Sequence, residues 1–213
     1  VPKSSLEVFH YPVMMNEVVN ICNPKKGGSF VDCTFGGGSY SSELLKFPNT
    51  KVIAFDRDKT VQYRANKIKK KYGNRFNFYN KKFSNIDKVL KIKEKVDAVI
   101  FDLGMSSFQL SDMTRGFSFK SKDKIDMNMG LSSVSAEEVL NNYDEKILKL
   151  IIKIFGDEKE ASKIVKNILL ARKIKKISHV TDLVEIIEKS KKKRLQKKNK
   201  CMYQNFSSTQ NFC

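Results

Sequence analysis

The sequence predicts an α/β fold built on a parallel sheet, and three observations support this. Short apolar runs alternate with segments of helical periodicity along residues 13–102. A glycine turn, Asp32-Cys-Thr-Phe-Gly36-Gly-Gly38, directly follows the first apolar run. The fourth run ends in an acidic residue, Asp102. Strands that alternate with helices at this spacing are typical of a parallel sheet with crossover helices on its faces.

The elements of this sheet follow from the apolar runs in order. We expect strands at 29–33, 51–55, 75–79 and 96–102, the last of them buried, and helices at 13–22, 40–46 and 58–72. Helical periodicity returns after residue 135, where Ser135 and Glu138 have the spacing of a capping box. We expect the later helices at 144–155, 157–173 and 181–189.

Residues 104–132 show little periodicity, and loops of that length are uncommon unless they are functional. We therefore expect a Rossmann-like domain over residues 1–104 with four strands and a mostly helical insertion over 105–189. A basic tail over 190–213 has no clear periodicity and is expected to be disordered.

The glycine turn indicates a ligand site. Gly36 and Gly38 permit positive φ and a close approach of a ligand to the backbone, and the next helix offers N–H groups. Asp32, at the end of the strand, can lie beside a cation or bond a hydroxyl. This combination suits S-adenosylmethionine (SAM), whose sulfonium is positive, better than a pyrophosphate. An NAD site remains an alternative, although Ser41 occupies the third place of G-x-G-x-x-G. A turn that binds no ligand is another.

A second acidic residue supports a ligand that contains a nucleoside, as both SAM and NAD do. Asp56 ends the second apolar run, 20 residues after Gly36. In doubly wound sheets an acid at this place bonds the ribose hydroxyls of the ligand. The alternative is an ordinary carboxylate in a turn, and Asp56 does not by itself separate SAM from NAD.

Composition limits the other classes of function. The chain has 213 residues, of which 40% are hydrophobic, and no apolar run approaches the length of a membrane span. Its four cysteines stand far apart, so we expect neither a metal site nor a disulfide framework. We therefore expect the protein in a reducing compartment, the cytoplasm. Two histidines leave little basis for a histidine-dependent catalytic triad.

The net charge of +18 favours a polyanionic partner, nucleic acid above all. Residues 189–200 carry eight of the positive charges, and the rest of the chain is still +10. Lys69 and Lys70 are candidates for contact with an RNA backbone, as is Arg115. The alternatives are a compositional excess of lysine, a solvated helix face for the lysines, and an internal ion pair for Arg115.

Further motifs carry a resemblance to a known family. They are H-Y-P-V-M-M-N-E-V at 10–18, F-D-L-G-M-S-S-F-Q-L at 101–110, R-G-F-S-F at 115–119, D-M-N-M at 126–129 and F-G-D-E-K-E-A-S-K-I-V-K-N-I at 155–168. Together with the glycine turn, their order and spacing resemble the bacterial 16S ribosomal RNA cytosine-N4 methyltransferases, the RsmH/MraW family. The resemblance covers residues 9 to about 189.

The resemblance implies a class I SAM-methyltransferase sheet with a helical insertion after the fourth strand. It also implies methyl transfer from SAM to the exocyclic N4 of a cytidine in the 16S RNA of the small ribosomal subunit. The SAM contacts that it implies are Gly38, Ser39, Tyr40, Asp56, Phe83, Asp102 and Gln109. Ser39 and Tyr40 stand where glycine and histidine are common in the family, and Asn128 stands where arginine is usual.

Asp102 is the candidate catalytic residue. The lone pair of a cytosine N4 amine is delocalised into the ring, so catalysis must orient the amine and draw on its protons. Asp102 follows the fourth strand, at the edge where such sheets bind ligands. A role confined to SAM binding or structure is an equal alternative. Phe83, Phe108 and Phe117 can stack on a base or belong to the core.

The later motifs of the family are not found in the sequence, so we expect a C-terminally truncated or frame-shifted product with one flank of the sheet unpaired. Three classes of function remain. The first is a SAM-dependent RNA methyltransferase, the second an inactive RNA-binding remnant of that family, and the third an NAD-dependent Rossmann enzyme. A homodimer is left open.

Overall fold

The computed structural model describes residues 12, 14–90, 95–131 and 134–191. The chain divides into two compact units, Val1–Leu103 and Gly104–Cys213. The end of the expected tail, residues 192–213, lies outside the described residues.

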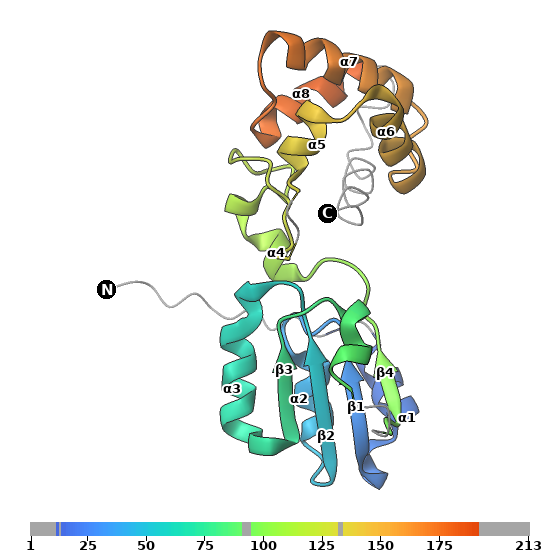
Figure 1. Ribbon diagram of the computed structural model, residues 1–213, viewed down its shortest axis with the longest axis vertical. Helices are drawn as coiled ribbons and strands as arrows, with labels where there is room; N and C mark the ends of the chain where they lie inside the picture. Colours follow the sequence, from blue (N-terminus) through green and yellow to red (C-terminus); the bar gives the residue numbers. More distant parts are fainter. Residues whose placement is uncertain (1–11, 13, 91–94, 132–133, 192–213) are drawn as a thin grey trace, which may run out of the picture. The chain divides into compact units, whose positions relative to one another are not determined.

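The first unit contains a four-stranded parallel sheet (Figure 1). Its strands are β1 (Gly28–Asp32), β2 (Thr50–Phe55), β3 (Phe76–Tyr79) and β4 (Ala98–Ile100), in the order β3-β2-β1-β4. Because β2 and β3 extend the sheet to one side of β1 and β4 lies on the other, the strand order reverses beside β1. This reversal is the topological switch point at which doubly wound sheets bind ligands. The predicted Rossmann-like sheet is confirmed.

Helices cover the sheet because the strands are apolar on both faces. The helices of this unit are α1 (Met15–Cys22), η1 (Pro24–Lys26), α2 (Ser39–Leu45), η2 (Lys59–Val61), α3 (Gln62–Tyr72), η3 (Gly73–Arg75) and η4 (Phe83–Lys88). The larger core includes Phe30, Leu44 and Phe76, all fully or almost fully buried. A smaller cluster around Val31 and Phe55 packs against Ile86 of η4.

The expectation of a buried fourth strand is wrong. β4 has three residues, and the side chain of Val99 is 41% exposed. The physical reason is position: among the described residues β4 pairs with β1 alone and so lies at an edge of the sheet. An apolar run cannot by itself distinguish a central strand from an edge strand.

The other edge of the sheet, β3, is capped by a lysine. Lys69 Nζ of α3 donates hydrogen bonds to the carbonyl oxygen of Phe76 (2.7 Å) and to Asn77 Oδ1 (3.0 Å). A charged side chain at the edge of a sheet discourages pairing with another chain. Lys69, expected as an RNA contact, is therefore engaged within the fold.

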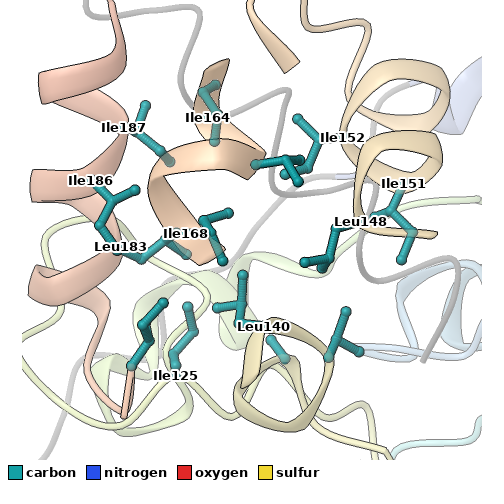
Figure 2. Close-up of a cluster of buried hydrophobic side chains, with 14 of the residues drawn as sticks. Ile125, Leu140, Leu148, Ile151, Ile152, Ile164, Ile168, Leu183, Ile186 and Ile187 are labelled. Atoms are coloured by element: carbon teal, nitrogen blue, oxygen red, sulfur yellow. The ribbon is translucent and has the colours of Figure 1, made fainter. Parts of the chain in front are cut away.

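The second unit is helical, as predicted. It contains α4 (Ser107–Ser111), η5 (Met113–Arg115), α5 (Ala136–Asn142), α6 (Glu145–Leu150), a π-helical turn η6 (Ile151–Phe155), α7 (Ala161–Ile174) and α8 (Val180–Ser190). Figure 2 shows its core, in which Leu140, Leu148, Ile168 and Leu183 come from four different helices. The Ser135 side chain accepts a hydrogen bond from the Glu138 N–H, as the capping pattern predicts.

Two details of this unit differ from the expectation. The helix expected from residue 157 begins at Ala161, because Asp157 has a φ of 46°, which no α-helix contains. The stretch 104–132 is not an open loop. Its Phe117, Ile125 and Met127 are buried in the core of the unit, and Ile125 N–H donates to the carbonyl of Ser178.

Candidate cofactor site

The carboxyl edge of the sheet gathers three carboxylates. Asp32 ends β1, Asp56 follows β2, and Asp102 lies two residues after β4. The charges of Asp56 and Asp102 both act on Asp32, where they raise its pKa. In a chain of net charge +18, this edge is locally negative. The structure thus brings together the three acids that the sequence singled out.

Asp32 is the most buried of the three, with no exposed surface. Ser41 Oγ donates to Asp32 Oδ2 (2.6 Å), and the Thr34 N–H donates to Asp32 Oδ1 (3.2 Å). Burial raises the pKa of Asp32 to about 6, and the neighbouring charges of Asp56 and Asp102 add to the rise. The two hydrogen bonds act in the opposite direction but do not compensate. A positive ligand beside Asp32 would favour its ionised form.

Ser41 is a site residue that the sequence reasoning did not assign. It stands at the third glycine place of the dinucleotide pattern, and the structure shows it buried in α2 with its hydroxyl on Asp32. A small hydroxyl-bearing residue at this place, nine residues after a strand-ending acid, is the signal that could have found it.

Asp56 holds the glycine turn in place. Its Oδ2 accepts from the Gly36 N–H (2.7 Å) and its Oδ1 from the Asp58 N–H (2.8 Å). Its backbone carbonyl accepts from Asn80 Nδ2, just after β3 (2.8 Å). Burial raises the pKa of Asp56, while the two backbone hydrogen bonds lower it. Asp56 therefore ties the end of β2 to the turn after β1 and to the end of β3.

Gly38 is required by the geometry of the turn. Its φ is 78°, and its N–H donates to the carbonyl of Phe35 (2.7 Å). A Cβ at this position would lie 2.7 Å from Phe35 Cζ and 2.7 Å from Ile68 Cδ1. The Phe35 ring is in turn fixed by the rings of Phe76 and Phe78, at centroid distances of 5.8 and 5.1 Å. The turn is thus folded directly onto an aromatic cluster.

Asp102 is positioned through its backbone. Its N–H donates to Thr34 Oγ1 (2.7 Å), while its side chain is exposed. Thr34 also donates its own N–H to Asp32, so this one residue joins the ends of β1 and β4. Thr34 is a second residue that the sequence reasoning missed. A threonine inside a glycine turn is common enough that no pattern marks it.

Replacing Thr34 by valine should release Asp102. The substitution keeps the shape of the side chain but removes the acceptor for the Asp102 N–H, so we expect a loss of about 1 kcal/mol in the free energy of unfolding. Amide exchange at Asp102 should accelerate, while exchange in β2 stays as it was. Thr181→Val, at an exposed threonine of α8, is the control. Unchanged exchange at Asp102 would contradict the assigned role of Thr34.

Aromatic side chains lie near the same strand ends. Phe83, at the start of η4, and Phe101, between β4 and Asp102, form an edge-to-face pair with a centroid distance of 5.4 Å. Phe83 is 40% exposed and Phe101 is 53% exposed. Exposed rings in such a pair offer an apolar surface to a base. Tyr40, in the first turn of α2, is buried, and burial raises the pKa of its hydroxyl.

The remaining candidates are engaged elsewhere. Gln109 and Arg115 belong to the second unit and have partners within it. Gln109 Oε1 accepts from the Ser106 N–H and completes the capping box of α4 (3.0 Å). Arg115 Nη2 donates to the carbonyl of Asn128 (2.6 Å), and its guanidinium lies 5.0 Å from the Phe117 ring centroid. These two contacts of Arg115 lie within the second unit.

Within residues 12, 14–90, 95–131 and 134–191, no group of three or more histidine, cysteine, aspartate or glutamate side chains is arranged to hold a metal ion. Over the same ranges, no helix has the length and apolar character needed to cross a membrane.

The parallel sheet with its switch point beside β1, the glycine turn and the strand-ending acids define a Rossmann-like α/β fold, a class in which ligands bind at the carboxyl edge of the sheet. Comparison with known sequences gives the family. The sequence model of the MraW methylase family matches residues 7–209. The chain belongs to the MraW methylase family.

Individual relatives agree with this assignment. The "Ribosomal RNA small subunit methyltransferase H" of Rickettsia massiliae (strain Mtu5) is 43% identical over 182 residues, which cover 85% of this chain and 59% of the relative. The protein of the same name from Orientia tsutsugamushi (strain Ikeda) is 41% identical, with 85% and 58% covered. That from Rickettsia canadensis (strain McKiel) is 43% identical over 186 residues, with 87% and 60% covered. The chain thus spans about three fifths of the length of these relatives.

Proposed function

We propose that the chain binds SAM at the carboxyl edge of its sheet and transfers the methyl group to N4 of a cytidine in 16S ribosomal RNA of the small subunit, in the cytoplasm. The observation that carries the proposal is the acidic character of this edge. Asp32 is fully buried with a raised pKa, and Asp56 and Asp102 act on it. A sulfonium is a cation without hydrogen-bond donors, and a concentrated negative potential is what attracts it.

The same edge is poorly suited to NAD. A pyrophosphate would bring negative charge next to three carboxylates. It would also need N–H groups of the glycine turn, and the Gly36 N–H already donates to Asp56. Dinucleotide sites depend on such free N–H groups at the turn and helix start. The charge and the hydrogen bonding of the turn therefore both favour SAM over NAD.

The proposed division of roles follows the geometry. Asp32, buried beside the glycine turn, supplies negative potential at the site. The ligand lies against Gly38, Ser39 and Tyr40. Asp56 has a second lone pair on each carboxylate oxygen, with which it can accept from the ribose hydroxyls. Gln109, which the family resemblance implies as a cofactor contact, lies in the second unit, where its side chain completes the capping box of α4.

Two aromatic rings are the proposed base platform. Phe83 and its neighbour Phe101 are both partly exposed and lie at the ends of β3 and β4. An edge-to-face pair keeps each ring in one orientation, so the platform is organised before a base arrives. Phe101 was not singled out in the sequence, because it stands inside an apolar run.

Asp102 is the proposed acceptor of the amine proton. SAM supplies an electrophilic methyl group. The Thr34 hydroxyl fixes the backbone of Asp102, and the exposed carboxylate can then hydrogen-bond the N4 amine and hold it in line with the methyl group. As the N–C bond forms and the C–S bond breaks, the proton lost from the amine passes to this carboxylate or to water.

Methyl transfer tests the proposal. The substrate is small ribosomal subunits from cells that lack this methylation, and the readout is tritium carried into RNA from methyl-labelled SAM. We expect transfer by the chain as it stands and a loss of about 100-fold or more in Asp102→Asn. Asp87→Asn, at an exposed carboxylate of η4, is the matched control and should retain activity.

A second candidate function is RNA binding without catalysis. The observation that favours it is the net charge of +18, which suits a polyanionic partner whether or not methyl transfer occurs. Binding of SAM and RNA without methyl transfer would establish this function and exclude the first.

A further inference from the structure

We propose that the outward face of α3 is a docking strip for single-stranded RNA; this rests on the proposed RNA substrate. Lys59, Tyr63, Lys67 and Lys70 follow one another at i, i+4, i+8 and i+11, so they share one face of η2 and α3. All four are exposed. The opposite face of α3 is occupied by the core residues Ala65 and Ile68.

The strip combines positive charge with an exposed ring. Tyr63 is 46% exposed. The guanidinium of Arg64 lies 4.4 Å from its ring centroid and the ammonium of Lys67 lies 5.5 Å from it. Proteins that bind single-stranded nucleic acid pair phosphate-binding cations with aromatic rings on which bases stack. The two cations beside Tyr63 place both kinds of contact at the same point of the helix.

The sequence of this helix and of the turns beside it is strongly basic. Residues 58–75 contain seven basic side chains and one acid, Asp58, which is buried and bonded to Thr60. The α3 face is complementary to a polyanion.

The lysines of α3 do not all belong to the strip. The ammonium group of Lys69 is bonded to Phe76 and Asn77 at the β3 edge. Lys70, the next residue, is exposed on the outward face. The structure therefore assigns Lys70 to RNA contact and Lys69 to the edge of the sheet.

The strip starts close to the proposed cofactor site. Lys59 is three residues after Asp56, and α3 then runs back along the sheet against β3 (Figure 1). From Tyr63 to Lys70 the helix rises about 10 Å, enough for two or three contacts along a strand. Phosphates would lie along this basic flank. The acidic edge repels phosphate, so only an uncharged base of the same strand would enter it.

The test measures RNA affinity of charge-matched variants of the full chain. The strip variant is Arg64→Gln, Lys67→Gln and Lys70→Gln, and the control is Lys146→Gln, Lys149→Gln and Lys153→Gln, three exposed lysines of α6 and η6. Both lose three charges. The probe is a fluorescein-labelled oligocytidylate of 12 nucleotides, followed by anisotropy over a salt series. We expect the strip variant to bind about tenfold or more weakly, with the salt slope reduced by about 2. The control should bind as the unmodified chain does.

Tyr63 provides an independent readout. Tyr63→Ala should weaken binding about fivefold or more with the salt slope unchanged, because stacking involves no counterion release. Tyr63→Phe, which retains a ring, should restore affinity. Equal losses in the strip variant and the control, or no loss in either, would overturn the proposal.

Titration of the same variants with SAM separates the two claims. If the unmodified chain binds SAM and the strip variant keeps its RNA affinity, the docking strip is wrong and the proposed function stands. If the chain fails to bind SAM but the strip variant alone loses RNA affinity, the docking strip stands and the proposed function is wrong.

Discussion

Asp32→Asn should raise the free energy of unfolding of the ligand-free protein at pH 7.5 by up to about 3 kcal/mol, and it should abolish SAM binding. Burial raises the pKa of Asp32 from 3.8 to about 6, and each pKa unit corresponds to about 1.4 kcal/mol. Asparagine fits the same two contacts: its oxygen can accept from the Thr34 N–H, and its amide can donate to Ser41 Oγ. The variant therefore removes a buried charge without leaving a partner unsatisfied.

The sign of the pH dependence follows from proton linkage. Because the folded protein holds the Asp32 proton more tightly than the unfolded chain, the folded state binds more protons between pH 4 and pH 6. The contribution of Asp32 to stability then falls as pH rises through this window and is constant above it. Asparagine does not titrate, so the difference in the free energy of unfolding between the variant and the unmodified protein should grow between pH 4 and pH 6.

Urea unfolding at pH 4, 5, 6 and 7.5 measures this difference directly. Other groups, including Asp56, also titrate in the folded protein, but they are common to both proteins and cancel in the comparison. Asp87→Asn, which removes an exposed carboxylate, should shift stability only slightly at every pH. A variant that is less stable than the unmodified protein at pH 7.5 would show that the ionised Asp32 is stabilised by its surroundings.

Gly38→Ala should strongly destabilise the protein. Its backbone has a φ of 78°, which costs about 1–2 kcal/mol for an L-residue. Its Cβ would also lie 2.7 Å from Phe35 Cζ. Forcing extra volume into a packed core costs about 1–3 kcal/mol. We expect the free energy of unfolding to fall by about 2–4 kcal/mol, measured by urea unfolding.

A double-mutant cycle separates the two causes. Phe35→Leu removes the ring atoms that the new methyl would meet, whereas the contact with Ile68 Cδ1 involves the flexible end of a side chain. Alanine at position 38 should therefore be tolerated better in the Phe35→Leu background, by about 1 kcal/mol or more. Additive effects of the two substitutions would mean that backbone strain alone accounts for the loss.

The acids and glycines of the site could be predicted from the sequence because they depend on local order. A residue that ends a buried strand must lie at the carboxyl edge of a parallel sheet, and this placed Asp32, Asp56 and Asp102 together. The predicted parallel sheet needed only the alternation of apolar runs and helices. The same local patterns found the capping pair at Ser135 and the apolar helices of the second unit.

What could not be predicted depends on contacts between distant residues. Ser41 and Thr34 are small polar residues whose roles arise only when β1, α2 and β4 are assembled. Lys69 and Lys70 are equivalent in the sequence and both are exposed, and only the position of β3 shows that Lys69 is the one bonded to the edge of the sheet. The exposure of Val99 likewise reflects which strands pair with β4, which no local pattern records.

Calorimetric titration of the unmodified chain with SAM, with Asp56→Ala and Asp87→Ala measured beside it, tests the central claim most directly. The acidic carboxyl edge should give saturable binding with one site per chain, retained in Asp87→Ala. Asp56→Ala should lose it, because the Gly36 and Asp58 N–H groups lose their acceptor and the turn is no longer held. A folded protein that does not bind SAM, or binds it equally well without Asp56, would contradict the account.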